Sequence, residues 1–350
     1  MTLPTGKFDR RSMERVVFPN TGRLSDRVVV GPGRGLDNAV VSIGKTKRLL
    51  MTTDPVSIVP SLGMKASAWL SVQLIASDYT TSGLRPEFAT FTYNLPREMT
   101  KSDAEEYLKS VGRECARLGV AVVAGHTGSY PGGGFTVVGG GTMFGFCEEG
   151  DYVDPTMARP GDAVLMTKGA AIEAATMLAR SFPDYVRRTA GRAACSRARG
   201  RLRDCSTVRD ALTASSLGLG RGGITSMHDA TEGGVLGGLE EMADASRTSF
   251  VVETGKIHVE ADCSAICRAF RIDPLTTVSE GSLLLTCHQS RADELRDKLA
   301  RNRIPAHQIG RVERGKGLWV KDASGRKRKA APGADRYWSA YERSVRAGLG

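Results

Sequence analysis

The chain has 350 residues, which is more than one ordinary hydrophobic core requires and predicts two domains. With 41% apolar and 25% charged residues, its composition is typical of globular proteins and excludes a largely disordered chain. No apolar run approaches the length needed to cross a bilayer, and the first residues lack the apolar centre of a signal peptide. We therefore expect a cytoplasmic protein without membrane contact.

The net charge of +11 raises the question of nucleic-acid binding. The basic residues form two runs, and no aromatic residues interleave with either run. Solvated faces are the first interpretation, and attraction of an anionic substrate or weak contact with RNA is the second. The two runs are Arg187, Arg188, Arg192, Arg197, Arg199, Arg201 and Arg203, and then Arg326, Lys327, Arg328 and Lys329.

The N-terminal half predicts strands that alternate with helices. The first 30 residues are polar and basic with little periodicity, and we expect them to be mobile. The expected strands cover residues 48–53, 88–93, 120–124 and 135–146, and the expected helices cover residues 64–77 and 102–118. For the second helix, Ser102 and Glu105 predict a capping box, and Gly119 predicts its end.

The C-terminal half shows a similar alternation after a turn at residues 159–162. The expected elements are a strand at 163–167, a helix at 171–180, a helix from Asp229 to about 246, a strand at 282–287 and a helix at about 290–300. Tyr337 and Trp338 predict a terminal helix. The expected units are a mobile segment 1–30, an N-terminal domain 31–157, a C-terminal domain 158–320 and a basic tail 321–350. The fold class is α/β (α+β) with two domains.

Seven cysteines occur without CxxC spacing, and we interpret them as buried free thiols. Cys263 and Cys267 share one helix face near His258. A structural zinc site needs about four ligands, however, and no partner pair is evident.

Three aspartates occur where the predicted elements end. Asp37 precedes an apolar stretch, Asp54 follows a strand, and Asp78 closes a helix. Taken singly, each is an ordinary cap or turn residue. Taken together, they are oxygen ligands of the kind that suits Mg²⁺ carrying the phosphates of a nucleotide.

The glycine-rich segments match no nucleotide-binding motif completely. Leu36 stands where the dinucleotide motif requires a third glycine after Gly31 and Gly33, and Ala39 stands where a P-loop requires its first glycine. The segment is either a cover over phosphates or an ordinary loop. His126, after the strand at 120–124, is a base, a phosphate donor, a metal ligand or a structural residue.

The segment Asp229-Ala230-Thr231-Glu232-Gly233-Gly234 places acids and paired glycines at a predicted helix start. Free backbone N–H groups at such a start bind anions. The alternative is a capped helix whose glycines allow close packing.

In order along the chain, these segments resemble landmarks of one superfamily. It contains aminoimidazole ribonucleotide (AIR) synthetase, selenophosphate synthetase, thiamine-monophosphate kinase and the HypE-type hydrogenase maturation factor. In the N-terminal half, GDDAAV is resembled by Gly35-Leu36-Asp37-Asn38-Ala39-Val40-Val41, TTD is matched by Thr52-Thr53-Asp54, and NDLAAMGAKP is resembled by residues 77–86. GGDT is resembled by Ala124-Gly125-His126-Thr127. In the C-terminal half, RPGD is matched by residues 159–162, and DPTRGG is resembled by residues 229–234. Ser279-Glu280-Gly281 makes the maturation-factor branch the most similar one.

The resemblance implies an N-terminal sheet that pairs with that of a second subunit in a barrel, and a C-terminal α/β domain. It implies ATP and Mg²⁺ as cofactors and a reaction that phosphorylates an oxygen of a small acceptor. Asp37, Asp54 and Asp78 would hold the metal. Gly33, Gly35, Asn38, Gly125 and Thr127 would contact the nucleotide, Asp78, His126, Asp229 and Glu232 would act in catalysis, and Gly233 and Gly234 would complete the site on the acceptor side.

The chain departs from the family pattern at three points. Leu36 replaces the first aspartate of GDD, and His126 replaces the aspartate of GGDT. The maturation factor carries a cysteine at its extreme C-terminus, whereas the last cysteine here is Cys287. We therefore do not expect dehydration on a terminal cysteine by this chain alone. A kinase of the thiamine-monophosphate type and a non-catalytic nucleotide-binding or scaffold protein are the alternatives.

Overall fold

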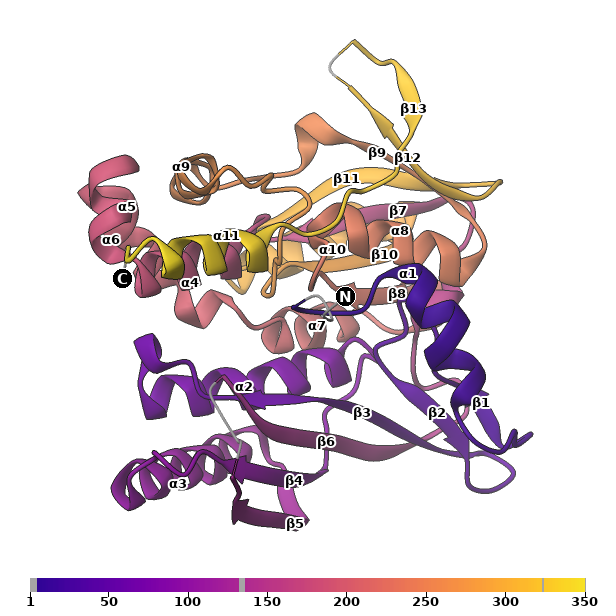
Figure 1. The fold of residues 1–350 in the computed structure, drawn as a ribbon. Coiled ribbons are helices and arrows are strands. Elements are labelled where there is room, and N and C mark those ends of the chain that lie inside the picture. The colour runs from indigo at the N-terminus through magenta and orange to yellow at the C-terminus, as the bar shows by residue number, and fades with distance from the viewer. Residues whose placement is uncertain (1–4, 132–135, 323, 350) are drawn as a thin grey trace.

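The computed structural model describes residues 5–131, 136–322 and 324–349. Two α/β domains lie one above the other, the N-terminal domain in indigo and purple and the C-terminal domain in pink to yellow (Figure 1). This arrangement confirms the predicted two-domain α/β (α+β) class. Within the described ranges, no helix is long and apolar enough to cross a membrane.

The N-terminal sheet has six strands in the order β1-β2-β3-β6-β4-β5. Neighbouring strands are antiparallel except for β4 and β5, which are parallel. The strands are β1 (Val28–Val30), β2 (Ala39–Ser42), β3 (Lys47–Ser57), β4 (Phe88–Leu95), β5 (Ala121–Ser129) and β6 (Val137–Glu148). The predicted first residue of β6, Phe135, lies outside the described ranges.

Two helices, α2 (Met64–Thr80) and α3 (Lys101–Leu118), pack on this sheet and on each other. α2 is buried along most of its length because it lies between the two domains, and such a helix needs no polar face. The predicted capping box of α3 is wrong. Thr100 is the N-cap, and its hydroxyl accepts a hydrogen bond from the Asp103 backbone N–H at 3.1 Å. Gly119, at φ +77°, ends the helix as predicted.

The C-terminal sheet has seven strands in the order β13-β12-β9-β11-β7-β10-β8. They are β7 (Asp162–Thr167), β8 (Ile224–Asp229), β9 (Ser249–Glu253), β10 (Leu283–His288), β11 (Ala306–Glu313), β12 (Gly317–Lys321) and β13 (Lys327–Lys329). α8 (Gly234–Ser246) covers one face, and α7 (Val208–Ser215) and α10 (Ala292–Arg301) cover part of the other. The sequence patterns did not predict β8, β9, β11, β12 or β13.

A separate group of helices packs at the end of the C-terminal domain opposite β13 (Figure 1). These are α4 (Ile172–Ser181), α5 (Pro183–Thr189), α6 (Arg192–Gly200), α9 (Ala261–Phe270) and α11 (Tyr337–Arg346). The first basic run lies on α5, on α6 and on the 3₁₀ turn Arg201–Asp204 that follows. The predicted terminal helix is therefore present, and Tyr337 is buried in this helical core.

The first residues of the described chain pack against the C-terminal domain. Asp9 caps the short helix α1 (Arg10–Ser12), and Arg10 forms an ion pair with Asp244 of α8 at 2.9 Å. One π-helical turn (Met13–Val17) and one 3₁₀ turn (Phe18–Asn20) follow. The predicted mobility of residues 1–30 stays a prediction.

The cysteines are free thiols, as predicted. Six are buried, and only Cys147 is partly accessible. Burial raises the pKa of the Cys115 thiol to about 11 and that of Cys263 to about 12. These thiols therefore stay protonated and unreactive near neutral pH.

The first strand of the C-terminal domain depends on one buried carboxylate. Asp162 accepts hydrogen bonds from the Arg159 backbone N–H at 2.9 Å and from the Thr225 hydroxyl at 2.7 Å, and only 4% of it is exposed. Replacing it with alanine removes the shared acceptor of these two hydrogen bonds, which link the start of β7 to β8. We predict that Asp162→Ala lowers the free energy of unfolding by about 1–3 kcal/mol, measured as a lower melting temperature. The exposed pair of Asp184 with Arg187 is the control, because Asp184→Ala should change stability by less than about 1 kcal/mol.

Candidate active site at the domain junction

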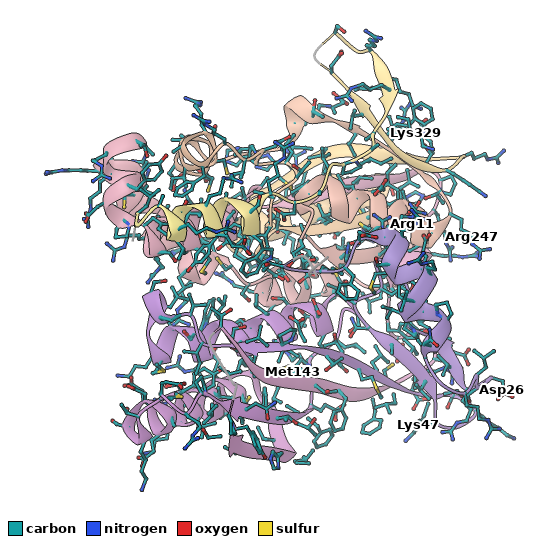
Figure 2. All side chains as sticks on the ribbon, in the orientation of Figure 1. Arg11, Asp26, Lys47, Met143, Arg247 and Lys329 are labelled. Carbon is teal, nitrogen blue, oxygen red and sulfur yellow. The ribbon has the colours of Figure 1, made fainter. Side chains whose placement is uncertain are left out.

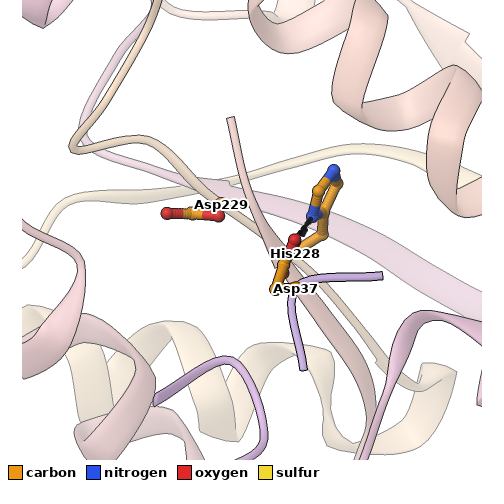
Figure 3. A group of neighbouring side chains, drawn as sticks. All are labelled: Asp37, His228 and Asp229. Carbon is orange, nitrogen blue, oxygen red and sulfur yellow. Dashed lines mark hydrogen bonds and ion pairs between the residues drawn. The ribbon is translucent and has the colours of Figure 1, made fainter. Parts of the chain in front are cut away.

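Five carboxylates from both domains meet where the domains join, and we call them the acidic centre: Asp37, Asp54, Asp78, Asp229 and Glu280. Asp37 precedes β2, Asp54 lies in β3 and Asp78 lies in the last turn of α2. Asp229 is the last residue of β8, and Glu280 lies in the loop before β10. Figure 3 shows Asp37 and Asp229 on either side of the β8 backbone. The structure thus brings together the three aspartates selected from the sequence.

Two of these positions differ from the sequence expectation. Asp54 lies inside β3, which continues to Ser57, and not at the end of a strand. Asp229 closes β8 and does not open the following helix, since α8 begins only at Gly234, with Gly233 at its N-cap. The side chain of Asp229 is therefore free of a capping role and projects into the junction.

Asp229 is the most deeply buried carboxylate of the acidic centre. It is fully buried, and its hydrogen-bonding neighbour is another carboxylate, that of Asp78. Within the described chain no N–H or hydroxyl donor reaches its oxygens, and the same holds for Oε2 of Glu280. Burial and the neighbouring charge of Asp37 raise the pKa of Asp229 to about 7. Burial also raises the pKa of Asp54 to about 7 and that of Asp78 well above its usual range. Such crowded carboxylates require protons or cations.

His228 supplies one of these cations from within the chain. Its Nδ1 lies 2.7 Å from Oδ1 of Asp37, and its Nε2 lies 3.1 Å from Oε2 of Glu241 (Figure 3 shows the first contact). Burial opposes the charged imidazole, but the two carboxylates outweigh it and raise the pKa of His228 to about 10. The ring is therefore an imidazolium at neutral pH. It neutralises part of the charge of Asp37, the first predicted metal ligand.

The two ends of the chain meet at Glu232, which lies beside the acidic centre. The Lys7 backbone N–H donates to Oε2 of Glu232 at 2.7 Å, and the Trp338 indole N–H donates to Oε1 at 2.9 Å. Burial opposes the charge of the Lys7 ammonium, but Glu241, Asp37, Asp78 and Glu232 together raise its pKa. The residue as a whole is exposed, and its ammonium adds a second cation beside the acidic centre. Glu232 is therefore held in place at both oxygens.

Of the two predicted nucleotide-contact glycines before β2, Gly35 packs against α8. Gly35 has φ +70°, and a β-carbon there would lie 2.6 Å from Cβ of Glu241. Its neighbour Arg34 forms ion pairs with Glu240 and Asp244, each at 2.6 Å. At Gly33, a β-carbon would meet the side chain of Leu36. Contact of Gly33 and Gly35 with a nucleotide stays a prediction.

Asn38 lies directly beside the acidic centre. Its side-chain amide donates to the Asp78 carbonyl at 2.7 Å and to the Thr81 hydroxyl at 3.0 Å. Its buried Oδ1 accepts no hydrogen bond from the described residues. The amide oxygen is thus free to accept a bond from a ligand or to join a metal coordination shell.

The paired glycines of the Asp229 segment have different roles. Gly233 donates its backbone N–H to Oδ2 of Asp335 at 3.1 Å. Gly234 has φ +63°, and a β-carbon there would collide with the Thr277 carbonyl. Position 234 therefore requires glycine for packing. This agrees with the alternative interpretation of the segment, in which the glycines allow close packing of a helix.

Gly125, His126 and Thr127 lie away from the acidic centre of their own chain. They belong to β5, the edge strand, and β4 and β6 separate β5 from β3. His126 is exposed, and its Nε2 contacts the Tyr130 hydroxyl at 2.6 Å. One chain therefore does not bring these three residues to the three aspartates.

Comparisons with known proteins match both halves of this architecture. The family model described as AIR synthase related protein, N-terminal domain, matches residues 35–147, and the corresponding C-terminal domain model matches residues 159–322. The chain belongs to the AIR synthase-related family. This confirms the superfamily inferred from the ordered sequence landmarks.

Individual relatives lie near the hydrogenase maturation branch. A carbamoyl dehydratase HypE of Cupriavidus necator is 26% identical over 299 residues, which cover 83% of this chain and 78% of the relative. The structure of a hydrogenase maturation protein HypE in complex with ATP superposes with a TM-score of 0.67 at 20% identity, covering 95% of this chain and 96% of that one. A thiamine-monophosphate kinase with AMPPCP and TMP superposes with a TM-score of 0.64 at 20% identity, over 86% and 90% of the two chains. The structural likenesses establish the fold.

Sequence reasoning missed four residues around the acidic centre: Lys7, Glu173, His228 and Glu280. Glu280 had a signal, because it is the acid of the Ser279-Glu280-Gly281 landmark. Glu173 lies in the first turn of α4, and burial raises its pKa to about 8. The sequence around Lys7 contains no pattern that indicates contact between its segment and the C-terminal domain.

The raised pKa values predict how pH affects stability without a divalent cation. Asp54 and Asp229 titrate at about 7 when folded and at about 4 when unfolded, so the folded state binds more protons between these values. Their stabilising contribution is complete below about pH 4 and is lost as the pH rises through about 7. We predict that the melting temperature in EDTA falls across this window, and that Mg²⁺ raises it most above about pH 7. Asp229→Asn should flatten both responses, whereas Asp151→Asn, in an exposed turn, should not. Equal profiles for wild type and Asp229→Asn would contradict this electrostatic account.

Proposed function

We propose that the protein binds ATP with Mg²⁺ at the acidic centre and phosphorylates an oxygen of a small acceptor. The observation that carries this proposal is the Asp229 carboxylate, which is fully buried beside Asp54, Asp78 and Glu280 and which no N–H or hydroxyl donor of the described chain reaches. A donor set of carboxylates and one free amide oxygen, that of Asn38, fits a hard divalent cation. The membership of the family and the ATP-bound HypE relative support the nucleotide.

Specific residues would hold the cation and orient the phosphates. Asp54, Asp78 and Asp229 would supply carboxylate ligands. Asp37 lies close as well, since ligand atoms of Asp37, His228 and Asp229 lie within 4.8 Å of one another, but Asp37 already pairs with His228. When bound, Mg²⁺ would neutralise phosphate charge and favour transfer. The imidazolium of His228 and the ammonium of Lys7 limit the repulsion between the acidic centre and an anionic substrate. Glu232 would hold the two chain ends over the side of the site where the acceptor substrate binds, since its two carboxylate oxygens accept hydrogen bonds from Lys7 and Trp338.

A non-catalytic nucleotide-binding protein is the second candidate, and one observation favours it. The ion pair of Asp37 with His228 removes one of the predicted metal ligands, which weakens the case for a complete metal site. Release of ADP in the presence of candidate acceptors would identify an enzyme. Binding of MgATP without turnover across such acceptors would identify the second candidate.

We also propose that the protein forms a homodimer through β5. This strand pairs with β4 on one side only, and nearly all of its residues are exposed, including Val122 at 50% and Val123 at 53%. An exposed apolar edge strand invites pairing with another strand. A second copy would cover Gly125, His126 and Thr127, the residues that the single chain leaves away from its acidic centre.

For the nucleotide, we predict that MgATP raises the melting temperature of the wild-type protein and does not raise that of Asp78→Asn. Ligand at one hundred times its dissociation constant adds about 2.7 kcal/mol of stability. The amide resembles the protonated form of Asp78, so the variant without ligand should melt at the wild-type temperature or higher. Asp151→Asn is the matched control. A wild-type protein that is folded and shows no shift at millimolar MgATP would refute the proposed function.

For the dimer, we predict that Val123→Lys converts the protein to a monomer of 37.4 kDa. A charge on the edge strand opposes pairing because it would have to be buried. Light scattering after size-exclusion chromatography gives the mass directly. Val345→Lys on α11, at a valine that is 56% exposed, should leave the dimer intact. A wild-type protein that elutes as a monomer at micromolar concentration would contradict the proposal.

A further inference from the structure

The positive charge of the chain is concentrated in one segment of the C-terminal domain. Between Arg180 and Arg203 the sequence contains eight arginines and one acid, Asp184, which gives a local charge of +7 out of a total of +11. This segment folds into the end of α4, then α5 and α6, at the end of the domain opposite β13 (Figure 1). The other basic run ends at Lys329 on β13 (Figure 2), so the two concentrations of charge are separate surfaces.

Four of these arginines surround one hollow with a volume of about 360 Å³. Its lining includes Arg180, Arg187, Arg192 and Arg199, together with Cys195 and Ser196. No carboxylate lines it among the residues that the structure describes. We call it the arginine hollow. Its volume is near the lower end of the range of about 300–1,000 Å³ typical of small-molecule sites.

Helical geometry explains why these side chains share the hollow. Arg192, Ser196 and Arg199 are four and three residues apart on α6, so they lie on one face of the helix. Arg197 lies on another face of the same helix, where its charge contributes to a lowered pKa of Asp262. Arg180 is fixed at the rim, because its Nε and Nη2 donate to the Arg199 carbonyl at 3.1 and 2.7 Å.

The arginines of the hollow have fewer compensating charges than Arg201, which follows them in the sequence. Arg201 pairs with Asp262 at 2.9 Å and with Glu260 at 3.3 Å. Among the described residues, Arg187 is the one arginine of the hollow with an acidic partner, the exposed Asp184 at 2.6 Å. Burial and the proximity of Arg199 lower the pKa of Arg180, as expected where like charges crowd. Converging guanidinium groups repel one another unless an anion lies between them.

We propose that the arginine hollow is a binding site for phosphate groups, separate from the acidic centre. Guanidinium groups form planar pairs of N–H donors that match phosphate oxygens, and Ser196 adds a hydroxyl donor. The phosphate belongs either to a small phosphorylated molecule or to the backbone of a nucleic acid. The absence of aromatic residues from the lining excludes base stacking as the means of recognition.

The test uses inorganic pyrophosphate as the probe, in EDTA, with the full-length protein and isothermal titration calorimetry. Without a divalent cation the acidic centre repels an anion, so binding reports on the hollow. We expect wild-type binding, and a loss of affinity of about tenfold or more in Arg192→Glu and in Arg199→Glu, because charge-assisted bonds are removed. Arg197→Glu is the matched control, since it makes the same charge change on another face of α6. It should retain affinity within about twofold to threefold.

Several outcomes would overturn the proposal. The first is that the wild-type protein does not bind pyrophosphate. The second is that Arg197→Glu and Arg199→Glu lose equal affinity for pyrophosphate, which would indicate general attraction by net charge. If circular dichroism shows that a glutamate variant is unfolded, the corresponding glutamine variant, Arg192→Gln or Arg199→Gln, is used in its place. The glutamine variants should also lose affinity for pyrophosphate. Asp78→Asn should bind pyrophosphate as wild type does, so failure at the acidic centre and failure at the hollow are distinguishable.

Competition identifies the source of the phosphate. If single-stranded RNA binds with a strong salt dependence, loses affinity in Arg199→Glu and is displaced by pyrophosphate, a nucleic-acid backbone occupies the hollow. If pyrophosphate binds and RNA does not compete, the ligand is a small phosphorylated molecule. Either result supports the phosphate site.

Discussion

Repulsion among buried carboxylates at the domain junction is the constraint on which the rest of the structure depends. Asp229 lies fully buried beside Asp54, Asp78 and Glu280, and a folded chain must compensate such an accumulation of charge. The protein does so partly with protons and partly with two cations, His228 of the C-terminal domain and Lys7 of the N-terminal segment. Buried charge of this kind is concentrated at functional sites in proteins. Its position on both sides of a domain interface explains why the interface has to be well ordered.

α2 provides that order. It is buried between the two domains and carries Asp78 in its last turn, while Ser77 accepts a hydrogen bond from the Thr207 backbone N–H of the other domain at 3.0 Å. Gln73 on the same helix accepts a hydrogen bond from Ser206 at 2.6 Å. These polar contacts fix the rotation of α2 about its axis, which apolar packing alone would leave less defined. The carboxylate of Asp78 therefore faces Asp229 as a consequence of contacts several residues away.

The local patterns of the sequence predicted much of the fold and the composition of the acidic centre. The periodicity of apolar residues and the positions of glycines predicted α2, α3 and β7. The order of the sequence landmarks predicted the family. The patterns could not show that β3 continues past Asp54, because Pro55 suggested an end. β9 and β11 were missed, since their partners in the sheet are distant in the sequence. The charges of His228 and Lys7 depend on contacts across more than 190 positions of the chain, which no local pattern reveals.

The convergence of both chain ends on Glu232 also imposes an order of assembly during synthesis. Lys7 leaves the ribosome early, but its anchor Glu232 follows much later, and Trp338, which fixes the other oxygen, is made later still. Domains fold as they emerge, beginning with the N-terminal one. The acidic centre of a nascent chain therefore stays open on this side until residue 338 has emerged.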